Sequence, residues 1–483
     1  MRLVQSWPLL WVSGALIVGA GLAVLLPSSA VTWLLLVASL LGLVGLGLIL
    51  LGHPRWLLGI GLGLVVVLAG LGTLVRTAIA PIPTGARPMT DQVVTIVSAP
   101  GERVHGLVAY ADMELGQTVN RVRLEWIGGE AYRYGTRLVV DGRLRPGAIE
   151  ERFNERGYLL AHGAMGVLEA TRLEVVDGRA GHGLLRWLHD LRLNLIDRLR
   201  GALAAPEQAI VAGILLGERS DFSAELEEVF RRTGTTHILV VSGSNVVVIA
   251  MVVLGLVQLV HRRLALGVTA LVLAGFVVVS GADTSVVRAT MFYGLYLLAQ
   301  LTGRRVHGPT VVAATAALML LITPWLLIYD AGFQLSFAAV LGLVLFQPWF
   351  NAVLPPLFVP EYAAPALAAH VATLPILVYT FGSASLVAPL VNALIGPLVP
   401  VIMALGAAVA ALPGIRLLAW LAEGVTTLLI LVVTSFAQLP WAAEDLPRHH
   451  LGWTTLTLAL LGVVAVLAQR WLVRERRLGR AGL

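Results

Sequence analysis

The stretch Thr233–Ala250, TGTTHILVVSGSNVVVIA, combines a strongly apolar run with several polar positions. Those positions are His237, Ser242, Gly243, Ser244 and Asn245. A polar group inside a membrane segment costs on the order of a few kcal/mol, so it normally faces a bundle interior or an aqueous path. Two interpretations fit this stretch. Its small residues pack helices closely together, or they mark an unwound segment whose backbone lines a cavity.

The whole chain has the composition of a membrane protein. Of its 483 residues, 58% are hydrophobic and 13% are charged, and the mean hydropathy is +0.85. The chain contains no cysteine and no lysine, which excludes disulfides, thiolate metal sites and a P-loop ATPase. Apolar runs of about 20 residues recur, and each can cross a hydrocarbon core about 30 Å thick. We therefore predict a polytopic α-helical membrane protein with about 12 transmembrane segments.

Composition also divides the chain into regions. Residues 76–232 hold about three quarters of the acidic residues. Five short β-type segments there, bounded by turn residues, predict an extracytoplasmic β-barrel of OB-like type, with a ligand-free sandwich as the alternative. Leucines at helical spacing follow and predict an amphipathic helix that lies on the membrane surface or packs against the spans. The predicted regions are three transmembrane helices (1–75), the β domain (76–180), interfacial helices (181–235), the transmembrane domain (236–472) and a basic tail (473–483).

The arginines indicate the orientation in the membrane. Cytoplasmic loops carry an excess of basic residues. The clusters that flank the apolar segments lie at Arg2, Arg55, Arg262–Arg263, Arg304–Arg305, Arg416 and the tail. All of them fall on one side if both termini are cytoplasmic, which places the β domain outside.

Further polar groups interrupt the later apolar segments. Arg288 lies about one turn into its segment, where it needs an anion or water. It either lines an anion path or forms a structural ion pair with Asp283 or Asp330. Asp330 and Gln334 are four residues apart and therefore share one helix face. Asn392 precedes two prolines, a pattern typical of a kinked segment around a path.

Four stretches, in this order, resemble the ComEC family of competence proteins. They are GILLGERSDFSAELEEVFRRTGTTHILVVSG (213–243), SGADTSVVRATMFYGLYLLAQLTGRR (280–305), DAGFQLSFAAVLGLVLF (330–346) and HVATLPILVYTFGSASLVAPLVNALIGPLVP (370–400). The resemblance implies a channel of the bacterial plasma (inner) membrane that admits single-stranded transforming DNA, with an OB-like domain near its mouth. The expected path residues are His237, Ser242, Gly243, Asn245, Arg288, Asp330, Gln334 and Asn392.

The β domain has a residue mixture that suits single-stranded DNA. OB domains bind single strands through a basic groove and aromatic stacking platforms. The candidate contacts are Arg121, Arg123, Trp126, Tyr132 and Tyr134, although a solvated β surface has a similar composition.

Two departures from the family limit what the resemblance implies. Asn245 stands where many members have His, and Asn has no titratable group. Many members also carry a metallo-β-lactamase-like domain with a His-x-His-x-Asp-His motif, which does not occur in this sequence. We expect no metal, no cofactor and no enzymatic activity. The expected partners are single-stranded DNA, membrane lipid, a separate DNA receptor, a cytoplasmic translocase and a separate nuclease.

Two other classes of function remain as alternatives. A secondary transporter or flippase for another anionic solute also uses broken, Gly- and Pro-rich segments. An intramembrane serine hydrolase would pair Ser242 with His237, but on a regular helix their side chains lie about 140° apart.

Overall fold

The computed structural model describes residue 83 and residues 85–477, except 104–105, 116–117, 129, 151–152, 258–261, 304–307, 355–359 and 447–450. The three helices predicted for residues 1–75 lie outside these residues. The chain divides into two compact units. The first contains Met1–Arg186 and Leu298–Gln334, and the second contains Trp187–Leu297 and Leu335–Leu483.

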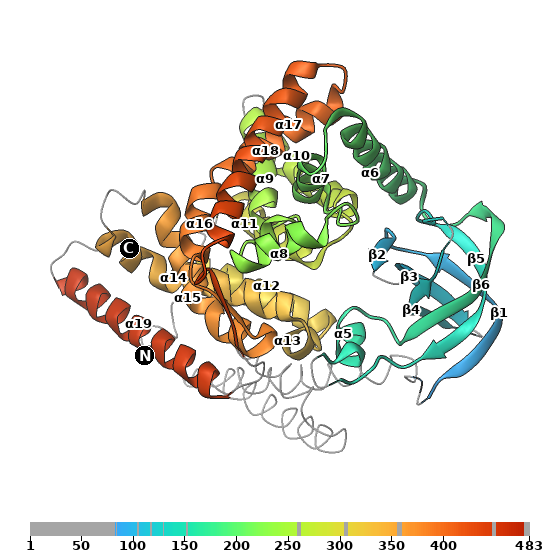
Figure 1. The fold of residues 1–483 in the computed structure, drawn as a ribbon, viewed down its shortest axis with the longest axis horizontal. Helices are drawn as coiled ribbons and strands as arrows, with labels where there is room; N and C mark the ends of the chain where they lie inside the picture. The colour runs from blue at the N-terminus through green and yellow to red at the C-terminus, as the bar shows by residue number, and fades with distance from the viewer. Residues whose placement is uncertain are drawn as a thin grey trace, which may run out of the picture. The chain divides into compact units, whose positions relative to one another are not determined.

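The first unit contains a closed β-barrel, as the sequence predicted (Figure 1). The closed order is β1-β5-β6-β4-β3-β1, in which only β4 and β6 pair in parallel. Period-two alternation points one set of side chains inward, and Val122, Leu124 and Trp126 of β4 lie in the barrel core. The strands are β1 (Arg87–Ile96), β2 (Gly101–Arg103), β3 (Gly106–Leu115), β4 (Thr118–Trp126), β5 (Thr136–Arg145) and β6 (Val167–Arg179).

Among its described residues, the first unit also contains three helices. The helix α5 (Glu155–Ala161) lies between β5 and β6 in the chain, and α12 (Gly308–Ile322) is followed by the short α13 (Leu326–Tyr329). The α5 helix packs on α13, where the Tyr329 ring lies so close to Gly157 that an added Cβ would be 2.2 Å from a ring carbon. Glycine at position 157 therefore permits this contact.

The second unit is helical and has one large apolar core. The core includes almost the whole of α7, whose residues from Gln208 to Ile214 are all buried. Within the region 181–235, predicted as amphipathic or interfacial helices, α7 is therefore a buried helix. The helices are α6 (Gly183–Ala202), α7 (Glu207–Leu216), α8 (Ala224–Arg232), η1 (Thr236–Ile238), α9 (Gly243–Val257), α10 (Arg262–Val279), α11 (Thr284–Leu301), α14 (Ala331–Val353), α15 (Pro360–Phe381), α16 (Ala388–Ile395), α17 (Leu398–Ala411), α18 (Arg416–Ala437) and α19 (Leu451–Arg477).

Several of these helices have the length and composition of membrane spans. In the described part of the chain, five segments qualify: Thr236–Val257, Ala331–Val353, Tyr362–Phe381, Arg416–Ala437 and Gly452–Trp471. The pair α16 and α17 qualifies as one span with a 45° bend. The bend falls at Gly396–Pro397, because proline cannot continue the preceding helix. The chain is a membrane protein with a barrel domain.

The C-terminal end differs from the prediction in one respect. The predicted basic tail begins at residue 473, whereas α19 continues to Arg477. The first part of the predicted tail is therefore helical.

Candidate functional site

The polar stretch that precedes α9 is a break in the helix. The single turn η1 holds His237, residues 239–242 are not helical, and α9 begins at Gly243. Of the two interpretations of this stretch, an unwound segment is therefore the one that matches the backbone. Polar groups freed by such a break must find partners within the protein.

Asn245 supplies one of those partners. Its side chain is 1% exposed, and its Nδ2 donates to the Ile214 carbonyl of α7 at 2.7 Å. Its Oδ1 accepts from the Ser242 hydroxyl at 3.0 Å. Ser242 also bonds the Ser244 hydroxyl at 2.6 Å. This set of bonds attaches the start of α9 to the end of α7, so packing is part of what the polar residues do.

These contacts give no support to a serine hydrolase. Ser242 is engaged with Ser244 and Asn245, and the exposed His237 bonds the Gly234 backbone. A nucleophile requires a base within hydrogen-bond reach.

The start of α9 also contacts α11, the helix that carries Arg288. The Ser285 hydroxyl donates to the Val241 carbonyl at 2.7 Å, and a Cβ on Gly243 would lie 3.3 Å from the Ala289 Cβ. Because Arg288 is three residues after Ser285, it shares the helix face that meets α9. Its side chain is 4% exposed. The structure thus brings Gly243 and the helix face of Arg288 together.

The other predicted path residues have local roles. Asp330 was predicted to share a helix face with Gln334, but it lies immediately before α14. There its Oδ1 accepts from the Phe333 backbone N–H at 2.9 Å. Gln334 donates to the Leu327 carbonyl at 2.9 Å. Both residues belong to the first unit. Asn392 belongs to the second unit and donates to the Ala388 carbonyl of its own helix.

In the barrel, the structure corrects two of the five predicted DNA contacts. Arg123 is 2% exposed and Trp126 is 3% exposed, so neither is available to a strand of DNA at the surface. Tyr132 packs partly buried against the core, and Tyr134 is also half-buried. Arg121 remains on the surface, where it pairs with Asp112 at 2.9 Å.

Arg123 is buried because α5 covers it. Its guanidinium bonds Glu155 of α5 and lies 2.8 Å from Glu125. Arg145 bonds Glu155 at 2.8 Å and Glu169 at 2.5 Å. Burial alone would raise the pKa of Glu155, but the Ala148 N–H and the two arginines outweigh it and lower the pKa to about 2. We call these residues (Arg123, Glu125, Arg145, Glu155 and Glu169) the barrel network.

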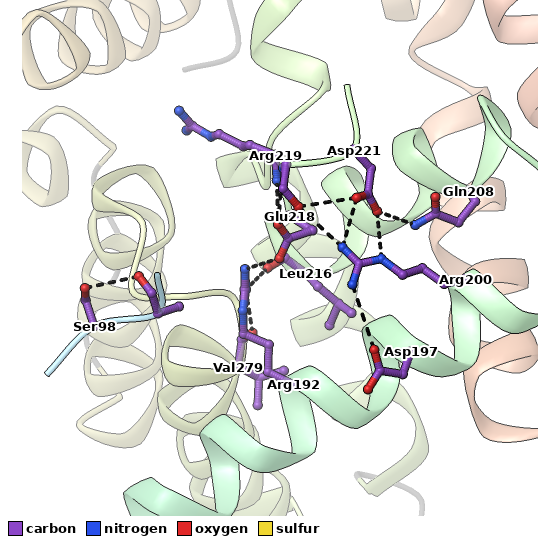
Figure 2. A network of polar contacts seen from close by, with 12 residues as sticks. Ser98, Arg192, Asp197, Arg200, Gln208, Leu216, Glu218, Arg219, Asp221 and Val279 are labelled. Carbon is purple, nitrogen blue, oxygen red and sulfur yellow. Dashed lines mark hydrogen bonds and ion pairs between the residues drawn. The ribbon is translucent and has the colours of Figure 1, made fainter. Parts of the chain in front are cut away.

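A second set of charged residues, which the sequence reasoning did not select, surrounds the loop between α7 and α8 (Figure 2). We call it the loop network, and its members are Arg192, Arg200, Glu218, Arg219, Asp221 and Asp283. Arg192 is 5% exposed. It donates to the Leu216 carbonyl, which ends α7, and to the Val279 carbonyl, which ends α10. A cation at the carboxyl ends of two helices is favoured by their dipoles.

The carboxylates of the loop network complete the arrangement. Glu218 accepts from Arg192 at 3.1 Å and from the Ser220 hydroxyl at 2.7 Å. Asp221 accepts two bonds from Arg200, at 2.9 and 3.0 Å, and one from Gln208. The Arg200 guanidinium lowers the pKa of Asp221. Asp283, one of the two acids considered as a partner for Arg288, forms an ion pair with Arg219 at 3.0 Å.

A third set of contacts fastens the end of α8. The short strands β7 (Ser383–Ser385) and β8 (Ala443–Asp445) pair in antiparallel fashion. The Ser385 hydroxyl donates to the Arg232 carbonyl at 2.9 Å, and Arg231 pairs with Asp445 at 2.9 Å. The loops after α15 and after α18 therefore meet the chain just before η1.

Comparison with known proteins places this helical unit in a family. A family model described as "Competence protein" matches residues 214–471, which is more than half of the chain. The chain belongs to the Competence protein family. The match begins at the end of α7, and it contains the break before α9, Arg288 and the carboxylates of the loop network.

Curated relatives agree with this assignment. ComE operon protein 3 of Bacillus subtilis (strain 168) is 30% identical over 213 residues, which are 43% of this chain and 26% of the relative. Competence protein ComA of Neisseria gonorrhoeae is 27% identical over 406 residues, 79% of this chain and 55% of the relative. Uncharacterized protein YcaI of Escherichia coli (strain K12) is 27% identical over 275 residues, 52% and 34%. The chain thus spans between a quarter and just over half of these relatives. No solved structure matches it.

Proposed function

We propose that this protein is a channel that passes single-stranded DNA inward across the bacterial plasma membrane in natural competence. The observation that carries the proposal is that the region matched to the competence family contains both the helix break before α9 and the buried Arg288 of α11. A buried arginine in an apolar helix suits a polyanion, because each phosphate in the path needs a cation or water.

We also propose an outward-facing β domain and cytoplasmic termini, because the arginines that flank the apolar segments then lie on the cytoplasmic side. With that orientation, the α7–α8 loop, the α10–α11 corner, β7 and β8 all lie on the outer side. These are the segments joined by the Arg219–Asp283 and Arg231–Asp445 ion pairs and by the β7–β8 pairing. Segments that bond one another must share a side of the membrane, so the proposed orientation is consistent with the contacts.

The proposal extends to the finer architecture. Five strands in a closed Greek-key order, with one parallel pair between β4 and β6, support an OB-like identity for the barrel. We propose 12 spans in total and the domain limits predicted above. We also propose that the chain is not itself an enzyme. A separate DNA receptor, a cytoplasmic translocase and a separate nuclease would then supply the remaining steps.

The test is transformation in a strain that lacks the gene. We expect the deletion to abolish transformation and the wild-type gene to restore it. Arg288→Ala, at unchanged abundance in the membrane, should not restore it, whereas Arg288→Lys, which keeps a cation, should restore it in part. Wild-type transformation with Arg288→Ala would contradict the role of Arg288.

The same strains separate the channel from a transporter for a smaller anion. Labelled DNA should reach the cytoplasm only in the complemented strain. A deletion strain that takes up DNA normally would overturn the proposed function and favour a transporter or flippase.

A further inference from the structure

The three arginines of the loop network are held to very different degrees. Arg192 is 5% exposed and bonds two backbone carbonyls and Glu218. Arg200 is held by a two-bond contact with Asp221. The side chain of Arg219 is 62% exposed, and its ion pair with Asp283 uses one guanidinium nitrogen. In Figure 2 the Arg219 side chain extends away from Glu218, whereas those of Arg192 and Arg200 point to the loop carboxylates.

The backbone of Arg219 is fixed even though its side chain is exposed. Glu218 accepts from the Arg219 backbone N–H at 3.2 Å and from the Ser220 backbone N–H at 3.2 Å. Glu218 is in turn held by the buried Arg192. Gly217 closes α7 in the left-handed conformation, with φ of 70°. A Cβ there would lie 2.9 Å from the Ser280 carbonyl oxygen, so the loop packs tightly on the α10–α11 corner.

Asp283 can release Arg219 without losing its structural contact. Its Oδ1 accepts from the Ser285 backbone N–H at 2.9 Å and so bonds one of the amide groups at the start of α11, which would otherwise lack a partner within the helix. Only Oδ2 contacts Arg219. Because exposed ion pairs contribute little to stability, separating this pair disturbs neither the helix nor the loop.

We infer that Arg219 is a phosphate-accepting residue whose partner Asp283 takes the place of a phosphate while no nucleic acid is bound. Guanidinium groups bind carboxylate and phosphate oxygens with the same donor geometry. A backbone phosphate of single-stranded DNA would displace the Asp283 carboxylate and pair with Arg219. This inference rests on the proposed function and adds to it an exposed residue that contacts the phosphates of the strand.

A purely structural ion pair makes a different prediction. If Arg219 and Asp283 only stabilise the fold, removing either one should have effects in the same direction. If phosphate competes with Asp283, removing the arginine should weaken DNA binding, while removing the competing carboxylate should strengthen it.

The experiment measures binding of a fluorescent oligothymidylate to the full chain in nanodiscs of neutral lipid, at several salt concentrations. For Arg219→Gln we expect roughly tenfold weaker binding and a salt-dependence slope smaller by about one, as for the loss of one phosphate contact. For Asp283→Asn we expect binding tighter by about threefold, since Asn still accepts from Ser285 and no longer competes for a cation. Tighter binding by this variant is the opposite of the loss that a damaged binding site would give.

The matched controls are Arg231→Gln and Asp445→Asn. These residues form another exposed ion pair of the second unit, at 2.9 Å, and neither variant should change DNA affinity. If the wild type binds DNA but Arg219→Gln and Asp283→Asn shift affinity in the same direction, or not at all, the inference is wrong and the proposed function stands. If the wild type shows no salt-dependent DNA binding, both are wrong.

Discussion

The barrel network and the loop network use the same chemistry to different ends. In the barrel, two arginines contact three glutamates and share two of them, Glu125 and Glu155, whose side chains are 25% and 12% exposed. In the helical unit, the three arginines of the loop network pair with its three carboxylates, and the outermost arginine, Arg219, is 62% exposed. In the barrel network both arginines converge on the same two carboxylates, whereas the loop network reaches from the buried Arg192 to the surface.

The difference shows how burial decides what an ion pair can do. A buried charge that loses its partner is strongly destabilising, so the buried Arg123 and Arg192 must keep theirs. An exposed pair is worth little and is screened by salt, so its members can exchange partners. The barrel network fastens α5 to the wall, and the loop network fastens one end while leaving an exchangeable cation at the other.

The largest effect should follow from removing the buried anchor of the loop network. Arg192→Met leaves Glu218 and the carbonyls of Leu216 and Val279 without their cation. The expected loss of unfolding free energy is about 3–5 kcal/mol, as for other broken buried pairs. Thermal unfolding of the purified protein in detergent measures it. The control is Arg198→Met on the same helix, an exposed residue, which should cost far less. Equal losses from both variants would show that Arg192 is not an anchor.

The sequence predicted the secondary-structure elements better than the contacts between side chains. The five strands, the break before Gly243 and the bend before Leu398 all depend on local patterns of turn residues, glycine and proline. The burial of Trp126 could also have been predicted, because in a strand it points to the same face as Val122 and Leu124, which line the barrel core.

The two networks could not be predicted in the same way. Arg123 lies on the outward side of β4 by alternation, and it is buried only because α5 folds back over it. Arg192 and Glu218 are 26 residues apart on different elements. Which arginine meets which carboxylate depends on tertiary packing, and neither periodicity nor composition carries that information.

A smaller effect should follow from removing the central carboxylate of the barrel network. The pKa of Glu155 is lowered from 4.5 to about 2, so its contribution is fully present above about pH 4.5 and is lost as the pH falls towards 2. Glu155→Gln should destabilise the barrel by about 1–2 kcal/mol at neutral pH, because the carboxylate is only partly buried and solvent screens its ion pairs. It should also remove much of the loss of stability in acid. Hydrogen exchange of the β4, β5 and β6 amides at pH 6 and pH 3 measures both effects.

The control for this variant is Glu174→Gln. Glu174 pairs with Arg172 on the barrel surface, and both side chains are more than half exposed, so neither stability nor its pH dependence should change. If Glu155→Gln remained as sensitive to acid as the wild type, the acid sensitivity of the barrel would belong to other carboxylates.

The smallest effect is expected at an exposed ion pair of the barrel. Arg121 and Asp112 lie on neighbouring strands with 46% and 27% of their side chains exposed. A double-mutant cycle with Arg121→Gln and Asp112→Asn should give a coupling energy of about 0–1 kcal/mol that disappears at high salt. The same cycle on Arg219 and Asp283 should give an equally small coupling energy in unfolding, because that pair is also exposed. A coupling of several kcal/mol at Arg219 and Asp283 would mean that this pair holds the fold. Exchange with phosphate would then be too costly, and the contrast between a closed barrel network and an open loop network would not hold.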